Sequence, residues 1–454
     1  MKAQRKIKMH KKLTPLCLIT ALFLIISSSL LPNGWATDKP SITIHNLINL
    51  TGVYASISVP YEKGGKDFLS WIAEQGGLDI NLDGKGDVEV KYLWAETGND
   101  PAQFMAAYKR FRMGRARFSL IEMISYPKPR ISILEMWPSP TLNIKAVLEI
   151  DNVVGFGISL NDFQLYPPSW NFADNGIYSE MAAGAIEYFV DQLWSKRGKD
   201  VKPKVALITW EKAFGRVSGQ LIKKHAAATG KYEVIVEQFF ADMPSDREVS
   251  EFLSDFEKRG VDIIWSNSTI QTSATIMKTL HKLGLSNKMF LLGNPSAPPD
   301  LLLEIVGPSI AEGYISPQSV FVPAAEPDEP GVKFAKRLNE KYRKDPKFPN
   351  IHYMNGIRMK AMMLESVRRA LVGMMKRDNI DLAKACKWIN GKEIREFGAQ
   401  TLAGYSAYDM TTKLQSAPSG KDDRRLTDHH RLIGIKDGKV TVLSPWYKAP
   451  RLIP

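Results

Sequence analysis

The sequence predicts an α/β protein of two doubly wound lobes, each a mostly parallel sheet with helices on both faces. Strand-like apolar runs alternate with helix-like segments along almost the whole chain, and parallel strands require such crossover helices. The alternation occurs in two series, and the second begins with a long helix-like segment at residues 175–195. The chain closes on a hairpin, in which Asp437-Gly438 is a strong turn signal.

The first series places helix-like segments between its strands. Asn99-Asp100-Pro101 predicts a helix start, because an N-cap residue followed by proline in the first turn is typical of one. Gly76-Gly77 ends the helix before it. The strands are expected at residues 42–48, 88–94, 131–137 and 153–158, and the helices at residues 59–75, 101–113 and about 143–150.

The second series repeats this pattern, with Gly230 and Gly284 at two helix ends. Glycine is favoured there because it readily adopts a left-handed conformation. The strands are expected at residues 204–209, 232–239, 261–265, 289–292 and 313–316, and the helices at residues 175–195, 214–229, 246–259 and 272–283. After Pro330, two longer helices at residues 332–343 and 350–374 precede the hairpin strands at residues 432–435 and 440–443.

The first 36 residues have the layout of a secretory signal peptide that is cleaved after Ala36. Six basic residues without an acidic neighbour precede an apolar core at residues 16–31. Gly34-Trp35-Ala36 then supplies the small residues that flank a cleavage site. The core is short for a membrane span, so an uncleaved anchor helix is the less favoured alternative. The mature protein is therefore expected in the periplasm.

Length, charge and cysteine content narrow the class of protein. The chain without its leader is long enough for two domains, and its 44% hydrophobic content is ordinary for a globular protein. Six of the 61 basic residues lie in the leader, and the others are scattered, so no nucleic-acid partner is predicted. Cys386 is the one cysteine beyond the leader, which excludes an intrachain disulfide in the mature chain.

The sequence gives no support to an enzyme. It contains no phosphate-binding loop, dinucleotide-binding glycine pattern, zinc-protease motif, nucleophile elbow or Cys-x-x-Cys pair. His429 and His430 are adjacent, so on a strand they would point to opposite faces. We therefore expect no catalytic residue, no metal site and no cofactor.

Residues 79–87 partly match a calcium-binding loop. They supply oxygen side chains at positions 1, 3, 5 and 9 and glycine at position 6 of such a loop. Val90 stands at position 12, where a bidentate glutamate is required. A polar turn ahead of the next strand is the favoured interpretation, and calcium binding is the alternative.

Four segments carry a family resemblance: LTGVYA at residues 50–55, KVALI and AFGR within residues 204–216, AEGY at residues 311–314, and DH at residues 428–429 before DGK at residues 437–439. Their order and spacing resemble the branched-chain-amino-acid (Leu/Ile/Val-binding) type of periplasmic solute-binding proteins of ABC importers, which have the type I periplasmic-binding fold.

The resemblance implies two Rossmann-like lobes joined by three hinge crossovers, near residues 171–175, 316–322 and 426–431. Lobe 1 would comprise residues 37–172 and 318–428, and lobe 2 residues 173–317 and 429–454. A small solute would be held between the lobes by hinged closure. The implied partners are the membrane permease and ATPase subunits of an ABC importer, and the protein itself is expected to be a monomer.

Ligand-site candidates are expected where strands end, because open α/β sheets bind ligands at the carboxyl ends of their strands. Small-solute sites combine a few directed polar groups with aromatic walls. The candidates at or near such positions are Tyr54, Trp137, Ser139, Thr141, Ser159, Tyr178, Trp210, Phe214, Asn267, Thr269, Asn294 and Tyr353.

Several candidates have a plain structural alternative. The resemblance implies a Ser/Thr pair in the ligand loop, here Ser139 and Thr141, but the neighbouring prolines also suit a stiffened turn. Ser125-Tyr126 is an alternative for that loop. A helix cap is the alternative for Ser159, and core packing is the alternative for Tyr178, Trp210 and Phe214.

The sequence leaves the ligand open among an amino acid, an amide and an aromatic acid. An amino acid needs a carboxylate for its ammonium group, because an unpaired buried charge costs several kcal/mol. Glu180 and Glu211 are the candidates for that partner. The aromatic residues near the loops suit an aromatic acid or an amide equally well. A sensor of the same fold, which signals rather than transports, is the alternative function.

Overall fold

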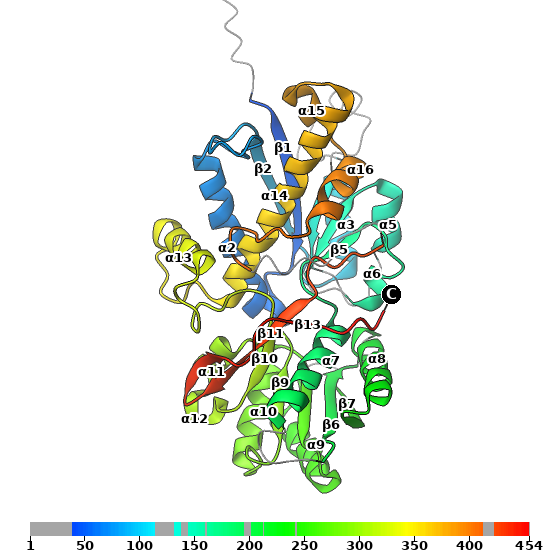
Figure 1. Ribbon diagram of the computed structural model, residues 1–454, viewed down its shortest axis with the longest axis vertical. Helices are drawn as coiled ribbons and strands as arrows, with labels where there is room; N and C mark the ends of the chain where they lie inside the picture. Colours follow the sequence, from blue (N-terminus) through cyan, green and yellow to red (C-terminus); the bar gives the residue numbers. More distant parts are fainter. Residues whose placement is uncertain are drawn as a thin grey trace, which may run out of the picture. The chain divides into compact units, whose positions relative to one another are not determined.

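The computed structural model describes residues 39–113, 131–137, 144–158, 161–194, 201–211, 213–240, 243–411 and 422–453, with only the backbone for residues 213–217. The described residues from Pro40 onward belong to one compact unit. They form an α/β structure with two separate sheets (Figure 1). Within these ranges, no helix is long and apolar enough to cross a membrane.

The first sheet has five parallel strands in the order β2-β1-β3-β4-β5. Its strands are β1 (Ser41–Ile48), β2 (Glu89–Glu96), β3 (Ile133–Met136), β4 (Val154–Gly157) and β5 (Asn171–Ala173). Strand β1, second in this order, pairs His45 with Leu93 of β2 on one side and with Leu134 of β3 on the other. All carboxyl ends therefore meet at one edge. We call the part built on this sheet the first lobe.

The second sheet has eight strands in the order β12-β11-β10-β9-β8-β6-β7, with β13 paired to β11 off this path. Its strands are β6 (Lys204–Trp210), β7 (Glu233–Phe240), β8 (Ile263–Asn267), β9 (Phe290–Gly293), β10 (Ile315–Gln318), β11 (His429–Lys436), β12 (Lys439–Val442) and β13 (Tyr447–Lys448). Strands β6 to β10 are parallel, and the last three add an antiparallel edge. We call this part the second lobe.

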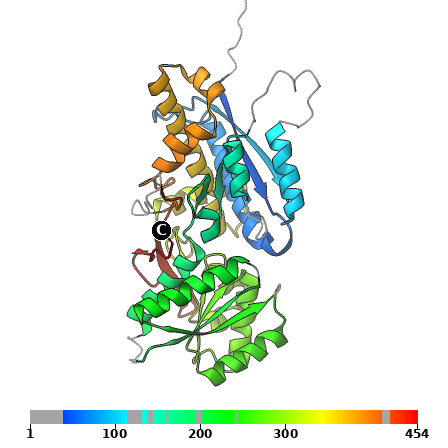
Figure 2. The ribbon, with the colours of Figure 1, turned by 90° about the vertical axis from the view of Figure 1, so that its right-hand side faces the viewer.

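Helices cover both faces of the second sheet (Figure 2), because alternate strand residues point to opposite sides. Ala206 and Ile208 of β6 belong to the apolar core on one face, and Val205 and Leu207 to the core on the other. The helices of this lobe include α7 (Tyr178–Tyr188), α8 (Ala213–Thr229), α9 (Asp246–Arg259), α10 (Ile270–Lys282), α11 (Pro299–Val306) and α12 (Pro308–Ala311).

Helices α2 (Ala55–Glu74) and α14 (Ile351–Asp378) pack against each other in the core of the first lobe. A Cβ atom on Gly64 would lie 2.1 Å from the backbone oxygen of Tyr353, and one on Gly356 would lie 1.9 Å from that of Tyr61. Glycine therefore permits the close helix contact.

The other helices are α3 (Pro101–Met113), α5 (Lys145–Asp151), α6 (Asp162–Leu165), α13 (Pro330–Tyr342), α15 (Leu382–Trp388) and α16 (Gly391–Glu393).

The chain segments that pass between the two sheets lie side by side. Ala173, at the end of β5, pairs with Arg425, which precedes β11: the N–H of Leu426 donates to the carbonyl of Ala173 at 2.8 Å. Ser319, which follows β10, donates its hydroxyl to the side-chain oxygen of Asn175. Three crossings of the chain thus form one contiguous junction.

The predicted fold class is confirmed, and most expected elements are present with small shifts at their ends. The helix expected at residues 175–195 begins at Tyr178 and changes to a π-helix at Phe189–Trp194. Short β5 and helix α11 were not predicted, because their apolar runs are too brief to show a period. The residue bounds proposed for the two lobes remain a prediction.

Candidate functional site

A cavity lies where the carboxyl ends of strands from the two sheets meet. It encloses about 710 Å³ of space, adjoining solvent included. The first lobe lines it with Asn49, Tyr54, Ile57, Trp137, Ile158, Asn161 and Gln164. The second lobe lines it with Tyr178, Trp210, Asn267, Ser268, Thr269, Asn294 and Ser296. Both sets follow the strand ends, where open α/β sheets present their ligand loops.

Two aromatic side chains meet across this cavity. The rings of Tyr54 and Trp210 are 5.6 Å apart between centroids and lie at 70° to each other, an edge-on arrangement. Tyr54 comes from the turn after β1, and Trp210 is the last residue of β6. Burial raises the pKa of the Tyr54 hydroxyl, and the nearby Tyr178 adds to this effect. Tyr54 therefore stays neutral at ordinary pH.

The amide side chains on the second lobe are held in fixed positions. Asn294 donates from Nδ2 to Oδ1 of Asn267 at 2.8 Å, and its own Oδ1 accepts from the backbone N–H of Ser296 at 2.9 Å. This chain of bonds leaves the Nδ2 donor of Asn267 without a partner among the described residues. The amide of Asn267 thus keeps its NH2 group available in a buried position.

Three further lining side chains have buried polar atoms that bind no other described residue. They are the indole Nε1 of Trp137, the hydroxyl of Thr269 and the acceptor Oδ1 of Asn161. Trp137 is 6% exposed and Thr269 is 2% exposed, so bulk water does not satisfy these groups. Unsatisfied buried donors are costly, and in binding proteins a ligand can satisfy them. The cavity therefore offers hydrogen-bond donors from both lobes.

No charged side chain occurs among the lining residues that the structure describes. Glu180, which the sequence analysis considers for an ammonium partner, is buried in an ion pair with Arg425 at 2.7 Å and 2.8 Å. It also accepts from the backbone N–H of Leu452 at 2.9 Å. Glu211, the other candidate, is exposed and does not line the cavity. The described part of the site is electrically neutral.

The structure brings together seven of the twelve residues proposed from sequence. They are Tyr54, Trp137, Tyr178, Trp210, Asn267, Thr269 and Asn294. Ser139, Thr141 and Ser159 lie outside the described residues, as do the alternative Ser125-Tyr126 and the side chain of Phe214.

Tyr353 is placed elsewhere, which corrects the expectation that it faces the cavity. It lies in the first turn of α14, fully buried, and its hydroxyl donates to Oδ2 of Asp67 at 2.8 Å. Its ring stacks on Phe348. The close packing of α14 on α2 turns this side chain into the core of the first lobe.

Sequence reasoning missed the other lining residues. Asn49 directly follows β1, and Ser268 lies between Asn267 and Thr269, so the strand-end rule could have found both. Asn161 is the N-cap of the short helix α6 and Gln164 lies within it, and the N–H of Asn161 donates to Oε1 of Gln164 at 3.0 Å. A four-residue helix has too little periodicity to be recognised in the sequence.

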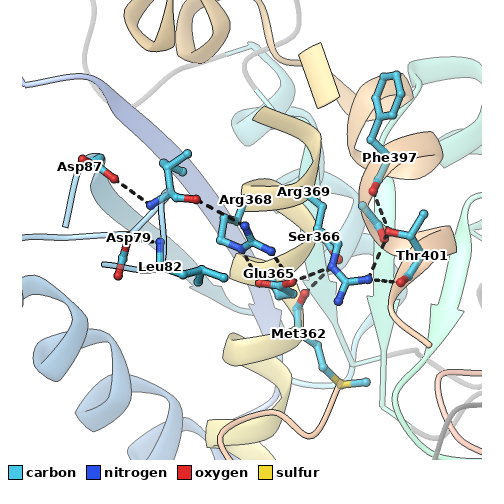
Figure 3. A network of polar contacts seen from close by, with 12 residues as sticks. Asp79, Leu82, Asp87, Met362, Glu365, Ser366, Arg368, Arg369, Phe397 and Thr401 are labelled. Atoms are coloured by element: carbon cyan, nitrogen blue, oxygen red, sulfur yellow. Dashed lines mark hydrogen bonds and ion pairs between the residues drawn. The ribbon is translucent and has the colours of Figure 1, made fainter. Parts of the chain in front are cut away.

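The segment at residues 79–87 forms a polar turn. Asp79 accepts from the backbone N–H groups of Leu82 at 2.6 Å and Gly84 at 2.7 Å. Arg368 of α14 donates to the carbonyl of Ile80 at 3.4 Å and also binds Glu365, so the turn is joined to that helix (Figure 3). These bonds agree with the favoured interpretation of the segment.

The adjacent histidines behave as the strand pattern predicts. His429 is half-buried and its Nδ1 lies 2.7 Å from Asp428, whereas His430 is fully buried. Burial lowers the pKa of His430 to about 3, and Arg358 adds to this effect. Within the described residues, no group of three or more His, Cys, Asp or Glu side chains is placed to hold a metal ion.

Comparison with known proteins identifies the family to which this chain belongs. The family model described as periplasmic binding protein matches residues 131–431. The chain belongs to this family. The resemblance seen in the sequence is thereby confirmed, and the family and the similar structures are solute-binding proteins rather than enzymes. A search of curated proteins finds no match.

Solved structures similar to this periplasmic binding protein share its two-lobed type I fold. A branched chain amino acid ABC transporter protein from Thermus thermophilus with bound valine is 19% identical, with a TM-score of 0.71 over 90% of this chain and 97% of that one. An ABC transporter substrate-binding protein of Aeropyrum pernix is 15% identical, with a TM-score of 0.69 over 90% and 96%. A fatty acid ABC transporter substrate-binding protein from Thermomonospora curvata is 18% identical, with a TM-score of 0.67 over 91% and 93%. At such identities the likeness concerns the fold alone.

Proposed function

We propose that this periplasmic binding protein is the extracytoplasmic substrate-binding component of an ABC importer. It captures a small solute of the amino acid, amide or aromatic acid class in the cavity between its lobes. The observation that carries the proposal is that both lobes contribute aromatic and amide side chains to one cavity at their strand ends. The signal-peptide layout of residues 1–36 supports a periplasmic location with cleavage after Ala36.

The mechanism that we propose is hinged closure. A solute binds one lobe and then gains contacts from the other, and it can favour the closed form only through this additional affinity. The junction around Ala173, Asn175 and Ser319 is the part of the chain where such a movement would be absorbed. The closed form then docks on the permease, and the ATPase subunits drive transport.

The test is a binding screen on the mature protein, from residue 37, after partial unfolding and dialysis to remove any bound solute. We expect one class of solute in a library of amino acids, amides and aromatic acids to raise the melting temperature in a saturable manner. Small-angle X-ray scattering should show a smaller radius of gyration with that solute. The variant Trp210→Ala removes an aromatic ring that lines the cavity, and it should weaken binding while the protein stays folded.

Failure of the whole library to bind would overturn the proposed function. Binding without any change in the radius of gyration would overturn hinged closure. Transport is tested separately, by stimulation of ATP hydrolysis in proteoliposomes that contain the importer. A solute that binds but never stimulates any importer would favour the sensor alternative.

A further inference from the structure

The chemistry of the cavity restricts its ligand further than the proposed function does. Resting on that function, we propose that the ligand is an acyl solute, a carboxamide or a carboxylic acid, with an aromatic or apolar body and without an ammonium group. Three features of the cavity carry this inference: its lack of a carboxylate, its unpaired donors and its aromatic walls.

An ammonium group has no charge partner in the described site. Glu180, near the start of α7, already receives two guanidinium N–H groups from Arg425. Its pairing partner is itself buried at 2% exposure, so withdrawing Glu180 would leave a buried charge unpaired. Asp162 is buried between the lining residues Asn161 and Gln164, but it does not itself line the cavity. Residues 138–143, 159–160 and 212, which adjoin lining residues in the sequence but are not described, contain no Asp or Glu. Among the residues that the structure describes, an α-amino acid would thus find no carboxylate in the cavity lining for its ammonium group.

The unpaired donors call for hydrogen-bond acceptors on the ligand. Trp137 from the first lobe and Asn267 from the second each line the cavity with a buried N–H group that has no partner among the described residues. Both side chains are more than nine-tenths buried. A carbonyl or carboxylate oxygen satisfies such donors, whereas a cation does not. This also disfavours a quaternary ammonium ligand, which the aromatic walls alone would suit.

The aromatic walls suit a planar or apolar body beside the acyl group. Tyr54, Tyr178 and Trp210 line the same cavity as the two donors. Such rings contribute a large apolar contact area, and the polar groups beside them orient the ligand. The acyl oxygen would therefore lie between Trp137 and Asn267, and the body of the ligand would lie against the rings.

The experiment compares compounds that share one apolar body and differ only in the acyl group or in the presence of an ammonium group. Isothermal titration of the stripped mature protein uses two trios: 3-phenylpropionamide, 3-phenylpropionate and L-phenylalanine, and isovaleramide, isovalerate and L-valine. We expect the amide or the acid of each trio to bind at least about 100-fold more tightly than its amino acid. The N–H donors of the cavity can bind an acyl oxygen, whereas an unpaired buried ammonium group costs several kcal/mol. Comparison of the amide with the acid in each trio shows which form of the acyl group the cavity binds more tightly.

Two variants sharpen the result. Asn267→Asp replaces the amide donor by a carboxylate. It should weaken the binding of the acyl compounds and reduce the difference in affinity between each of them and the amino acid of its trio. Glu211→Gln removes the exposed carboxylate and should leave all affinities unchanged. Circular dichroism and the melting temperature of each variant establish that it is folded.

The outcomes separate this inference from the proposed function. Equal or tighter binding of L-phenylalanine or L-valine overturns the inference and leaves the proposed function intact. Tighter binding of a quaternary ammonium compound such as glycine betaine than of every acyl compound also overturns the inference and leaves the proposed function intact. Failure of all six compounds also overturns the inference, whereas only failure of the wider library overturns the function.

Discussion

Arg358 of helix α14 donates to the backbone carbonyl of Asp174 at 2.9 Å and to its carboxylate at 3.3 Å. The same guanidinium donates to the carbonyl of Ser319 at 3.2 Å. One buried side chain of the first lobe thus binds two of the crossings that lead to the second lobe, and the third crossing is hydrogen-bonded to the first through Ala173. Arg358 therefore fixes the junction at which hinge movement would occur.

Removal of this guanidinium should destabilise the protein strongly. Arg358→Met removes the guanidinium partner of the buried Asp174 carboxylate, so we expect a loss of about 3–5 kcal/mol in the free energy of unfolding. Urea unfolding followed by circular dichroism measures the loss. Lys376→Met, an exposed change on the same helix, is the control and should cost little. Equal stability of the two variants would contradict the role given to Arg358.

A second buried ion pair joins Glu135 of β3 to Lys360 of α14, and both side chains are fully buried. Lys360→Met alone should lower the free energy of unfolding by about 3–5 kcal/mol, because it leaves Glu135 without its partner. The double variant Glu135→Leu with Lys360→Met removes both charges and should recover most of that loss. Chemical denaturation of the three proteins gives the comparison. A double variant less stable than the single one would refute this account.

Buried His352 should make the protein sensitive to acid. Burial lowers the pKa of His352 from 6.5 to about 3. The unfolded chain therefore takes up a proton near pH 6.5, while the folded chain does so only near pH 3. The contribution to stability is fully present above pH 6.5 and is lost as the pH falls towards 3.

His352→Gln should reduce the slope of unfolding free energy against pH by about 1.4 kcal/mol per pH unit between pH 6 and pH 4, which corresponds to one proton. Urea unfolding at several pH values measures the slope. The control is the same substitution at exposed His281. An unchanged slope in His352→Gln would show that this histidine is already charged in the folded protein.

The edge-on contact between Tyr54 and Trp210 should stabilise the arrangement in which the two lobes meet. A double-mutant cycle with Tyr54→Ala and Trp210→Ala should give a coupling of about 0.5–1.5 kcal/mol in the free energy of unfolding. Strictly additive effects would mean that the two rings do not meet in solution, and that the ligand-free protein is open there.

The candidate site was partly predictable because strand ends can be recognised locally. Asn267 and Asn294 follow apolar runs whose parallel pairing places their carboxyl ends at one edge. Tyr353 could not be placed in this way, because its direction depends on the contact of α14 with α2. The neutral character of the site was equally hidden, since Glu180 and its partner Arg425 are 245 residues apart in the chain.

The sequence by itself determined the alternation of strands and helices, the two series that form two sheets, and the closing hairpin around Asp437-Gly438. These features depend on local periodicity and turn chemistry, which act within a few residues. Only the tertiary structure decided which charges are paired, which donors remain unpaired in the cavity, and how Arg358 joins the crossings. Such pairings depend on side chains distant in the sequence, because packing of the sheets and helices brings them together.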